Sequence, residues 1–275
     1  MSLYYASASL AEAAIVIVGI PYDRTSSFIP GARLGPAHIR IATDNVESYS
    51  PYLQRDLETL RIHDAGDLVF TDMRWEMVAE LIQSAVRESQ DSGRFMVALG
   101  GEHSITAPIV AAHLARHRQL AVVQFDAHAD LREDFLGELH SHASVMRRCQ
   151  SLVGAESVFQ YGIRSGTAVE FAQAKRLYPF SVLAGLEESR TEFEGRPIYV
   201  TIDVDVLDPG VMPAVATPEP GGISYSELLQ ALRLLGNCHV VGFDIVEYNP
   251  LASRDPASAA LVATLLREAL LALVH

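Results

Sequence analysis

The sequence predicts an α/β fold of three layers, in which helices cover both faces of a central, mainly parallel sheet. Three observations support this prediction. Short apolar segments alternate with amphipathic segments of helical period along the chain. The apolar segments are hydrophobic at consecutive positions, which is typical of strands buried on both faces. Of the 275 residues, 49% are hydrophobic and 20% are charged, so the chain can bury a sizeable core.

Each element follows from a local pattern. Residues 13–20, 95–99, 120–125, 158–163, 198–202 and 239–243 are rich in valine, isoleucine and phenylalanine, and we expect them to be strands. Residues 75–90, 106–116, 168–176, 225–235 and 256–274 carry apolar side chains at helical spacing. This alternation predicts βαβ units with right-handed crossovers. The sequence has neither an internal repeat nor a clear linker, so we expect residues 1–275 to form a single domain.

The charge balance restricts the function. The chain has 34 acidic and 21 basic side chains, a formal net charge of -13 and no block of basic residues. These features argue against binding to nucleic acid or to an anionic membrane, and they suit a small cationic ligand. Lys175 is the single lysine, which disfavours Schiff-base and pyridoxal phosphate chemistry.

The cysteine content and the apolar segments indicate where in the cell the protein is expected. Cys149 and Cys238 are too few for a disulfide framework or a cysteine-based zinc site. No basic residue precedes Arg24, as a signal peptide would require, and Arg267 and Glu268 interrupt the apolar segment 261–274. We therefore expect a cytoplasmic protein that does not associate with a membrane.

Acidic and histidine side chains follow two of the predicted strands at alternate positions. Asp126, His128 and Asp130 come directly after the strand at 120–125, and alternate residues of an extended chain point to the same side. Asp203 and Asp205 follow the strand at 198–202 in the same way. Ligands bind beyond the carboxyl ends of parallel strands, so these side chains are candidates for a binding site.

A third strand contributes His103, in the sequence Gly-Gly-Glu-His-Ser at residues 100–104, where two glycines allow a tight turn. One aspartate pair alone would be an ordinary solvated strand end. All three groups together need a countercharge, because clustered carboxylates repel one another. Two divalent cations would balance the four aspartates. The donor set suits Mn²⁺, and less distinctively Fe²⁺, Co²⁺ or Zn²⁺, so we predict a dinuclear metal site.

The same segments resemble a known family. The chain is similar to the ureohydrolases, which include arginases and agmatinases, in motifs that follow the family's order across residues 19–250. These motifs are Gly-Ile-Pro-Tyr-Asp (19–23), Pro-Gly-Ala-Arg (30–33), Gly-Gly-Glu-His-Ser (100–104), Asp-Ala-His-Ala-Asp (126–130), Thr-Ile-Asp-Val-Asp-Val-Leu-Asp-Pro (201–209), Thr-Pro-Glu-Pro-Gly-Gly (217–222) and Glu-Tyr-Asn-Pro (247–250).

The resemblance implies an arginase-like fold and two Mn²⁺ ions bridged by a hydroxide. By position, one ion would be bound by His103, Asp126, Asp130 and Asp203, and the other by His128, Asp126, Asp203 and Asp205. The hydroxide would attack a guanidinium carbon and release urea and an amine.

Two further residues would complete such a reaction. Glu247 fits the carboxylate that binds the guanidinium, because a planar guanidinium pairs with a carboxylate through two hydrogen bonds. His142, in the segment Ser-His-Ala-Ser-Val-Met-Arg-Arg at 141–148, resembles the proton carrier of the agmatinase-like branch. His140 lies two positions earlier and remains an alternative for this role.

The expected substrate is agmatine, which would give putrescine. Residues 131–134, Leu-Arg-Glu-Asp, offer acidic groups where arginases contact the amino-acid carboxylate, and by resemblance Glu219 also favours a cationic tail. Ala214-Val215-Ala216 replaces a glycine-rich segment of many relatives, so aminopropylagmatine, guanidinobutyrate and arginine stay open. A metal-dependent amide hydrolase or deacetylase of similar fold is the second alternative. Relatives form trimers or hexamers, so we expect a homo-oligomer.

Overall fold

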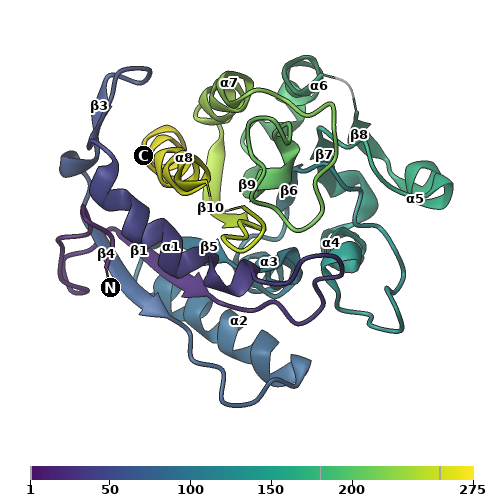
Figure 1. The fold of residues 1–275 in the computed structure, drawn as a ribbon, viewed down its shortest axis with the longest axis horizontal. Coiled ribbons are helices and arrows are strands. Elements are labelled where there is room, and N and C mark those ends of the chain that lie inside the picture. The colour runs from purple at the N-terminus through teal and green to yellow at the C-terminus, as the bar shows by residue number, and fades with distance from the viewer. Residues whose placement is uncertain (1, 180, 254) are drawn as a thin grey trace.

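The computed structural model describes residues 2–179, 181–253 and 255–275, and eight strands of these segments form one parallel sheet (Figure 1). Across the sheet the order is β4 (Ile62–Asp67), β1 (Ile15–Ile20), β5 (Phe95–Gly100), β10 (His239–Val246), β9 (Pro197–Asp203), β6 (Ala121–Phe125), β7 (Val158–Tyr161) and β8 (Arg176–Tyr178). All neighbouring strands in it are parallel. The predicted α/β fold is therefore confirmed. A separate antiparallel pair joins β2 (Tyr49–Ser50) to β3 (Arg55–Asp56).

Helices cover both faces of the sheet. One face packs against α2 (Trp75–Asp91), α3 (Thr106–Arg116) and α4 (Val145–Val153). The other packs against α1 (Gly35–Ala42), α6 (Val182–Ser189), α7 (Tyr225–Leu235) and α8 (Pro256–Leu273). Figure 1 shows these two helical layers on opposite sides of the strands, with the short α5 (Ala168–Gln173) beyond them near β8.

The central strands are mostly apolar because each face of the sheet enters a different core. In β1, Ile15 and Ile17 belong to the core that contains α8, whereas Val16 and Val18 belong to the core that contains α2 and α3. Burying each of these side chains contributes about 1.5–3 kcal/mol, which favours apolar residues at most positions of both faces. This is why the inner strands could be recognised from the sequence.

The helix α8 is long and apolar enough to cross a membrane by length and composition alone. However, 67% of it is buried inside the protein, and Leu265, Leu266 and Leu270 are fully inaccessible. Its hydrophobic character is accounted for by packing against α1, α7 and the sheet.

The sequence prediction missed some elements and misplaced others. The two outermost strands, β4 and β8, were not predicted, because an edge strand has half-exposed polar positions. The helix predicted at 168–176 ends at Gln173, where Ala174 adopts an extended conformation, and Arg176 belongs to β8. The strand predicted at 158–163 ends at Tyr161, because Gly162 turns the chain with φ 89°. The helices α1, α4 and α6 were also not predicted.

A buried ion pair connects α1 to the edge strand β4. The Arg40 side chain is 3% exposed, and its Nε and Nη2 donate to Asp64 at 2.8 and 3.0 Å. Arg40 also donates to Asp67. Burial alone would raise the pKa of Asp64, but hydrogen bonds from Arg40, Gly66 and Leu3 outweigh burial and lower the pKa. Asp64 is therefore ionised at neutral pH and paired with Arg40.

The four central strands determine where the functional residues lie. β5, β10, β9 and β6 are consecutive neighbours in the sheet. Glu247 and Asp126 directly follow β10 and β6, Asp203 is the last residue of β9, and His103 comes three residues after the end of β5. Neighbouring strands lie about 4.8 Å apart, so side chains from four sequence segments meet in a small volume at one edge of the sheet.

Candidate metal centre and active site

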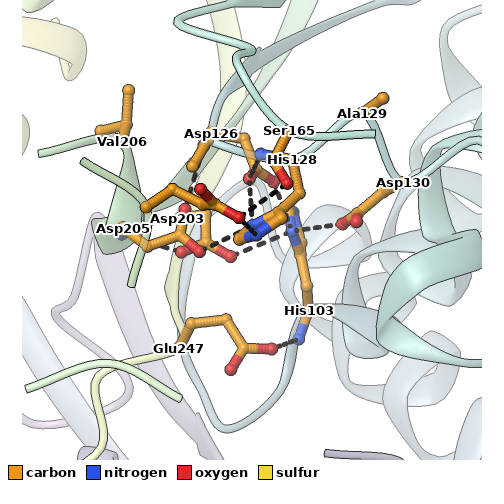
Figure 2. Close-up of polar contacts among 12 residues, drawn as sticks. His103, Asp126, His128, Ala129, Asp130, Ser165, Asp203, Asp205, Val206 and Glu247 are labelled. Atoms are coloured by element: carbon orange, nitrogen blue, oxygen red, sulfur yellow. Dashed lines mark hydrogen bonds and ion pairs between the residues drawn. The ribbon is translucent and has the colours of Figure 1, made fainter. Parts of the chain in front are cut away.

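The structure brings all six predicted ligand residues together. His103 Nδ1 lies 3.0 Å from Asp126, 3.3 Å from Asp130 and 3.4 Å from Asp203, each distance to a carboxylate oxygen. His128 Nδ1 lies 2.9 Å from Asp205 and 3.6 Å from Asp126. Figure 2 shows the carboxylates converging on the two imidazole rings.

The cluster contains two adjacent ligand groups. His103, Asp126 and Asp203 each offer a ligand atom, and these atoms lie within 4.8 Å of one another. Asp126, His128 and Asp205 form a second group of the same kind. Asp126 belongs to both groups, as a bridging carboxylate would. The arrangement therefore fits two cations side by side.

One unpaired atom indicates where the first cation fits. His103 is 1% exposed, and its buried Nδ1 makes no hydrogen bond to any residue that the structure describes. Burial opposes the charged imidazole, but Asp126, Asp130 and Asp203 outweigh burial and raise the pKa of His103 well above its usual value. Burial and the neighbouring Asp126 raise the pKa of Asp130 to about 7. The carboxylates thus create a negative field that favours a cation at this point.

A hydrogen-bonded triad behind His103 fixes which ring nitrogen faces the cluster. His103 Nε2 lies 2.8 Å from Thr201 Oγ1, and the Thr201 hydroxyl donates to Asp244 at 2.6 Å. Since a hydroxyl has a single proton, Thr201 must accept from His103 Nε2–H. When the ring is neutral, its lone pair is therefore on Nδ1, toward the carboxylates. Tyr199 and Thr106 also donate to the buried Asp244, both at 2.8 Å.

Hydrogen bonds also orient Asp126, the carboxylate that the two ligand groups share. Gln124 donates to Asp126 Oδ2 at 2.6 Å, and the backbone N–H of His128 donates to Oδ1 at 2.6 Å. Gln160 in turn donates to Gln124 Oε1 at 2.6 Å and to the carbonyl of Ala129 at 2.7 Å. Partners of this type hold ligands in position before a metal binds.

Two site residues have a left-handed backbone that side chains other than glycine seldom adopt. Asp130 has φ 52° and Glu247 has φ 66°. Such conformations cost about 1–3 kcal/mol each and persist where the surroundings hold them. The N–H of Glu247 donates to the carbonyl of Gly101, and the carbonyl of Asp130 accepts from Met146 and Arg147. These contacts keep both carboxylates directed toward the cluster.

A cavity of about 260 Å³ lies over the cluster and includes the two predicted catalytic residues, Glu247 and His142, in its wall. Glu247 Oε1 accepts from the backbone N–H of His103 at 2.7 Å, and the carboxylate is one of the cavity-lining groups. Burial, together with the nearby Glu102, raises the pKa of Glu247 well above its usual value. A cationic ligand would restore the ionised form by pairing with it.

The structure separates the two candidate proton carriers. His142 lines the cavity, and its Nδ1 lies 3.1 Å from Thr25 Oγ1. Burial lowers the pKa of His142 to about 4, so the ring is neutral at pH 7. His140 instead stacks on the Trp75 ring, with ring centroids 5.0 Å apart. This placement favours His142 over His140.

The acidic segment expected near the substrate tail is arranged differently. Glu133 is paired with Arg147 and Arg148 on the surface, and Asp134 accepts from Gly137. The cavity is lined instead by Arg132. The expectation that residues 131–134 offer acidic groups to the substrate tail was therefore wrong, because Glu133 pairs with two arginines on the surface.

The surroundings of Arg132 partly compensate its charge. Its guanidinium lies 5.3 Å from the centroid of the Phe135 ring, and its Nε lies 3.8 Å from the buried carboxylate of Glu170. The Ala214-Val215-Ala216 segment is buried, and the next residue, Thr217, lines the cavity.

The sequence did not identify the residues that support the site. These are Thr25, Gln124, Arg132, Thr201 and Asp244. Thr201 was visible as the first residue of the motif that contains Asp203, but an isolated threonine does not reveal its hydrogen-bond partner. Asp244 had a signal, since it is the single charged residue within a strand that is otherwise apolar after His239.

Comparisons with known proteins agree with this geometry. The family model described as the arginase family matches residues 13–272. Agmatinase from Bacillus anthracis is 42% identical over 269 residues, covering 96% of this chain and 93% of that protein. N(1)-aminopropylagmatine ureohydrolase from Thermus thermophilus is 35% identical, covering 87% and 84% respectively. The crystal structure of agmatine ureohydrolase of Thermoplasma volcanium superposes with a TM-score of 0.90 at 32% identity, covering 99% and 94%. The chain belongs to the arginase family.

Proposed function

We propose that this protein hydrolyses a cationic guanidino compound to urea and an amine, with agmatine as substrate and putrescine as product. The observation that carries the proposal is that Glu247, a carboxylate that can pair with a guanidinium, lines the same cavity as five of the predicted metal ligands. These ligands are His103, His128, Asp130, Asp203 and Asp205. Relatives that are 38–42% identical are agmatinases, which supports this substrate class.

We assign two divalent cations, Mn²⁺ in the cell, to the six clustered ligands. His103, Asp126, Asp130 and Asp203 would hold one ion, and His128, Asp126, Asp203 and Asp205 the other. When bound, the two cations would provide a nucleophile at neutral pH by lowering the pKa of water. The orphaned Nδ1 of His103 and the oxygen-rich donor set support this assignment.

Glu247 would bind and orient the substrate. One of its oxygens is occupied by the backbone N–H of His103, which leaves the second oxygen for a guanidinium N–H. A charge-assisted hydrogen bond of this kind is stronger than a neutral one, and it places the guanidinium carbon beside the metal ligands. The fixed, left-handed backbone at Glu247 keeps this geometry before substrate arrives.

The proton balance requires a carrier. Hydrolysis of a guanidinium adds one water, whose oxygen becomes the urea oxygen, and both water protons end on the leaving nitrogen as an ammonium group. The leaving nitrogen therefore has to be protonated as its bond to carbon breaks. His142 is neutral at pH 7, so its ring can accept a proton and transfer it to that nitrogen.

Glu219 would recognise the cationic tail. Its Oε1 accepts from Ser165 Oγ at 2.8 Å and lies 3.9 Å from His128 Nε2, beside the cluster. Arg164 holds the backbone around Glu219 by donating to its carbonyl at 2.8 Å and to the carbonyl of Asp205 at 2.8 Å. The Glu219 side chain is 38% exposed, so it remains available to a primary ammonium.

The test is urea release from a panel of guanidines after Mn²⁺ loading: agmatine, aminopropylagmatine, arginine and guanidinobutyrate. We expect the highest kcat/KM with agmatine. Glu219→Gln should lower kcat/KM for the two amine-tailed substrates and should spare guanidinobutyrate, whose tail is an anion. No urea from any member of the panel would overturn the proposal. Two bound metals per chain would also exclude the one-zinc amide hydrolase.

A further inference from the structure

Glu102 is a buried carboxylate that has no part in the proposed reaction. Glu102 comes between the end of β5 and His103, and it is fully inaccessible to solvent. It accepts four hydrogen bonds: from Thr25 Oγ1 at 2.7 Å, Thr25 N at 2.6 Å, Ser26 N at 3.1 Å and Ser104 Oγ at 2.5 Å. These donors occupy both carboxylate oxygens, so Glu102 holds the loop at Thr25 against the catalytic edge of the sheet.

The hydroxyl of Thr25 links Glu102 to His142. It donates its proton to Glu102, and it accepts from the backbone N–H of His142 at 3.0 Å. His142 Nδ1 lies 3.1 Å from the same oxygen. A hydroxyl has one donor and two acceptor positions. With the donor position used by Glu102, the contact with Nδ1 is a hydrogen bond only if Nδ1 carries the proton.

We propose that Thr25 and Glu102 are positioning residues that hold His142 in its Nδ1–H tautomer. This inference rests on the proposed function, in which His142 carries a proton. With Nδ1 bound to Thr25, the lone pair is on Nε2, at the opposite side of a ring that lines the cavity. Nε2 can then accept a proton and pass it to the leaving nitrogen, which returns the ring to its starting tautomer.

The same arrangement occurs at His103 with the opposite ring nitrogen. There the triad Asp244–Thr201–His103 fixes Nε2–H and directs Nδ1 at the metal ligands. In the triad Glu102–Thr25–His142, threonine binds Nδ1 and leaves Nε2 free. In each triad the carboxylate determines the direction of the threonine proton, and the threonine determines the histidine tautomer. A metal ligand needs its free lone pair on the nitrogen that faces the metal, and a proton carrier needs it on the nitrogen that faces the substrate. The first triad leaves Nδ1 of His103 free, and the second leaves Nε2 of His142 free.

Thr25→Val is the informative substitution, because valine keeps the shape of threonine and removes its hydroxyl. Glu102 also binds backbone N–H groups of the loop, so changing Glu102 would disturb the fold as well. We expect Thr25→Val to lower kcat by about tenfold, a part of the roughly 10²–10⁴-fold that a positioned acid–base group contributes. KM and the number of bound metals should not change. Thr25→Ser should restore kcat.

The tautomer itself can be measured without substrate, by ¹⁵N–¹H correlation spectra of the full-length chain labelled at histidine and loaded with diamagnetic Zn²⁺. The His142 signals are assigned by their loss in His142→Asn. We expect the Nδ1–H pattern in the wild type and in Thr25→Ser, and a mixture of tautomers in Thr25→Val. Thr264→Val, which removes a hydroxyl bonded to Ala260 within α8, is the matched control and should leave the spectrum and kcat unchanged.

An Nε2–H pattern for His142 in the wild type would overturn the inference, and this result needs no variant to fold. Unchanged tautomer and kcat in Thr25→Val would also overturn it. Failure of the proposed function looks different: the wild type would release no urea, while the spectra would still show Nδ1–H. The two conclusions can therefore fail separately.

Discussion

Replacing Asp244 with asparagine tests whether the triad behind His103 determines metal affinity. Asp244 is fully buried and accepts from Thr201 at 2.6 Å, and from Tyr199 and Thr106 at 2.8 Å. An amide offers one oxygen and one NH₂ group. With the NH₂ toward Thr201, the threonine must accept, and its own proton turns to His103 Nε2. The imidazole proton would then lie on Nδ1, the atom that faces the metal ligands.

The opposite amide orientation has a cost too, since the NH₂ group then faces the two hydroxyls that previously donated to Oδ2. Loss of a partner behind a metal ligand typically lowers metal affinity about 10–100-fold. This corresponds to about 1.4–2.7 kcal/mol at 25 °C. Calorimetric titration of metal-free Asp244→Asn with Mn²⁺ measures the change directly, and circular dichroism checks that the variant is folded.

Tyr199→Phe is the matched control, because it removes one donor to Asp244 and leaves the contact between Thr201 and His103 intact. We expect it to lower the free energy of unfolding by about 1 kcal/mol with little effect on metal affinity. Wild-type metal affinity in Asp244→Asn would refute the reasoning. Equal losses of affinity in both variants would show that general loosening, and not the tautomer of His103, is responsible.

Three other substitutions test separate parts of the structure. Asp126→Asn should remove bound metal and urea release together, measured by elemental analysis and by a urea assay, because Asp126 belongs to both ligand groups; retention of both metals would contradict its bridging role. His142→Ala should keep the metals and lower kcat by about 10²–10⁴-fold, and loss of metal instead would show that His142 is a ligand. Arg40→Met should lower the free energy of unfolding at pH 7 by about 3–5 kcal/mol, because the ionised Asp64 then stays buried without a countercharge. The lowered pKa of Asp64 makes the pair stabilising above the unfolded pKa of about 3.9, and this contribution is lost as pH falls through the folded pKa. Unfolding in urea should therefore show that the free energies of unfolding of Arg40→Met and the wild type differ less at pH 3 than at pH 7. The same difference at both pH values would be inconsistent with the ion pair.

The sequence predicted the inner strands and the residues at their ends, because each of these has a local pattern with a single physical explanation. The inner strands are buried on both faces, so their apolar character is unambiguous. The residues at their ends are chemically conspicuous, since aspartate and histidine at alternate positions after an apolar strand are uncommon. The edge strands β4 and β8 were missed because their environment is partly solvent. Nothing in their local sequence distinguishes them from loops.

The cavity wall was less predictable because it depends on which partner each side chain finds. Glu133 was expected near the substrate tail, but two arginines of α4 pair with it outside the cavity. Arg132, the adjacent residue, enters the wall instead. In the same way, Thr25 contacts His142 across 117 positions of sequence. Such contacts follow from tertiary packing, which local patterns do not encode.

Glu247 would couple the binding of a guanidine to the binding of metal, which neither ligand group can do alone. One oxygen of this carboxylate holds the backbone of His103, and the carboxylate also belongs to the cavity wall. A guanidinium that binds Glu247 would therefore act on the same group that positions His103, a predicted metal ligand. Thermodynamic linkage makes such an effect reciprocal: whatever factor a guanidine adds to metal affinity, the metal adds to guanidine affinity. Measured with a non-hydrolysable guanidine, that factor would express the cooperation between the two halves of the site as a single number.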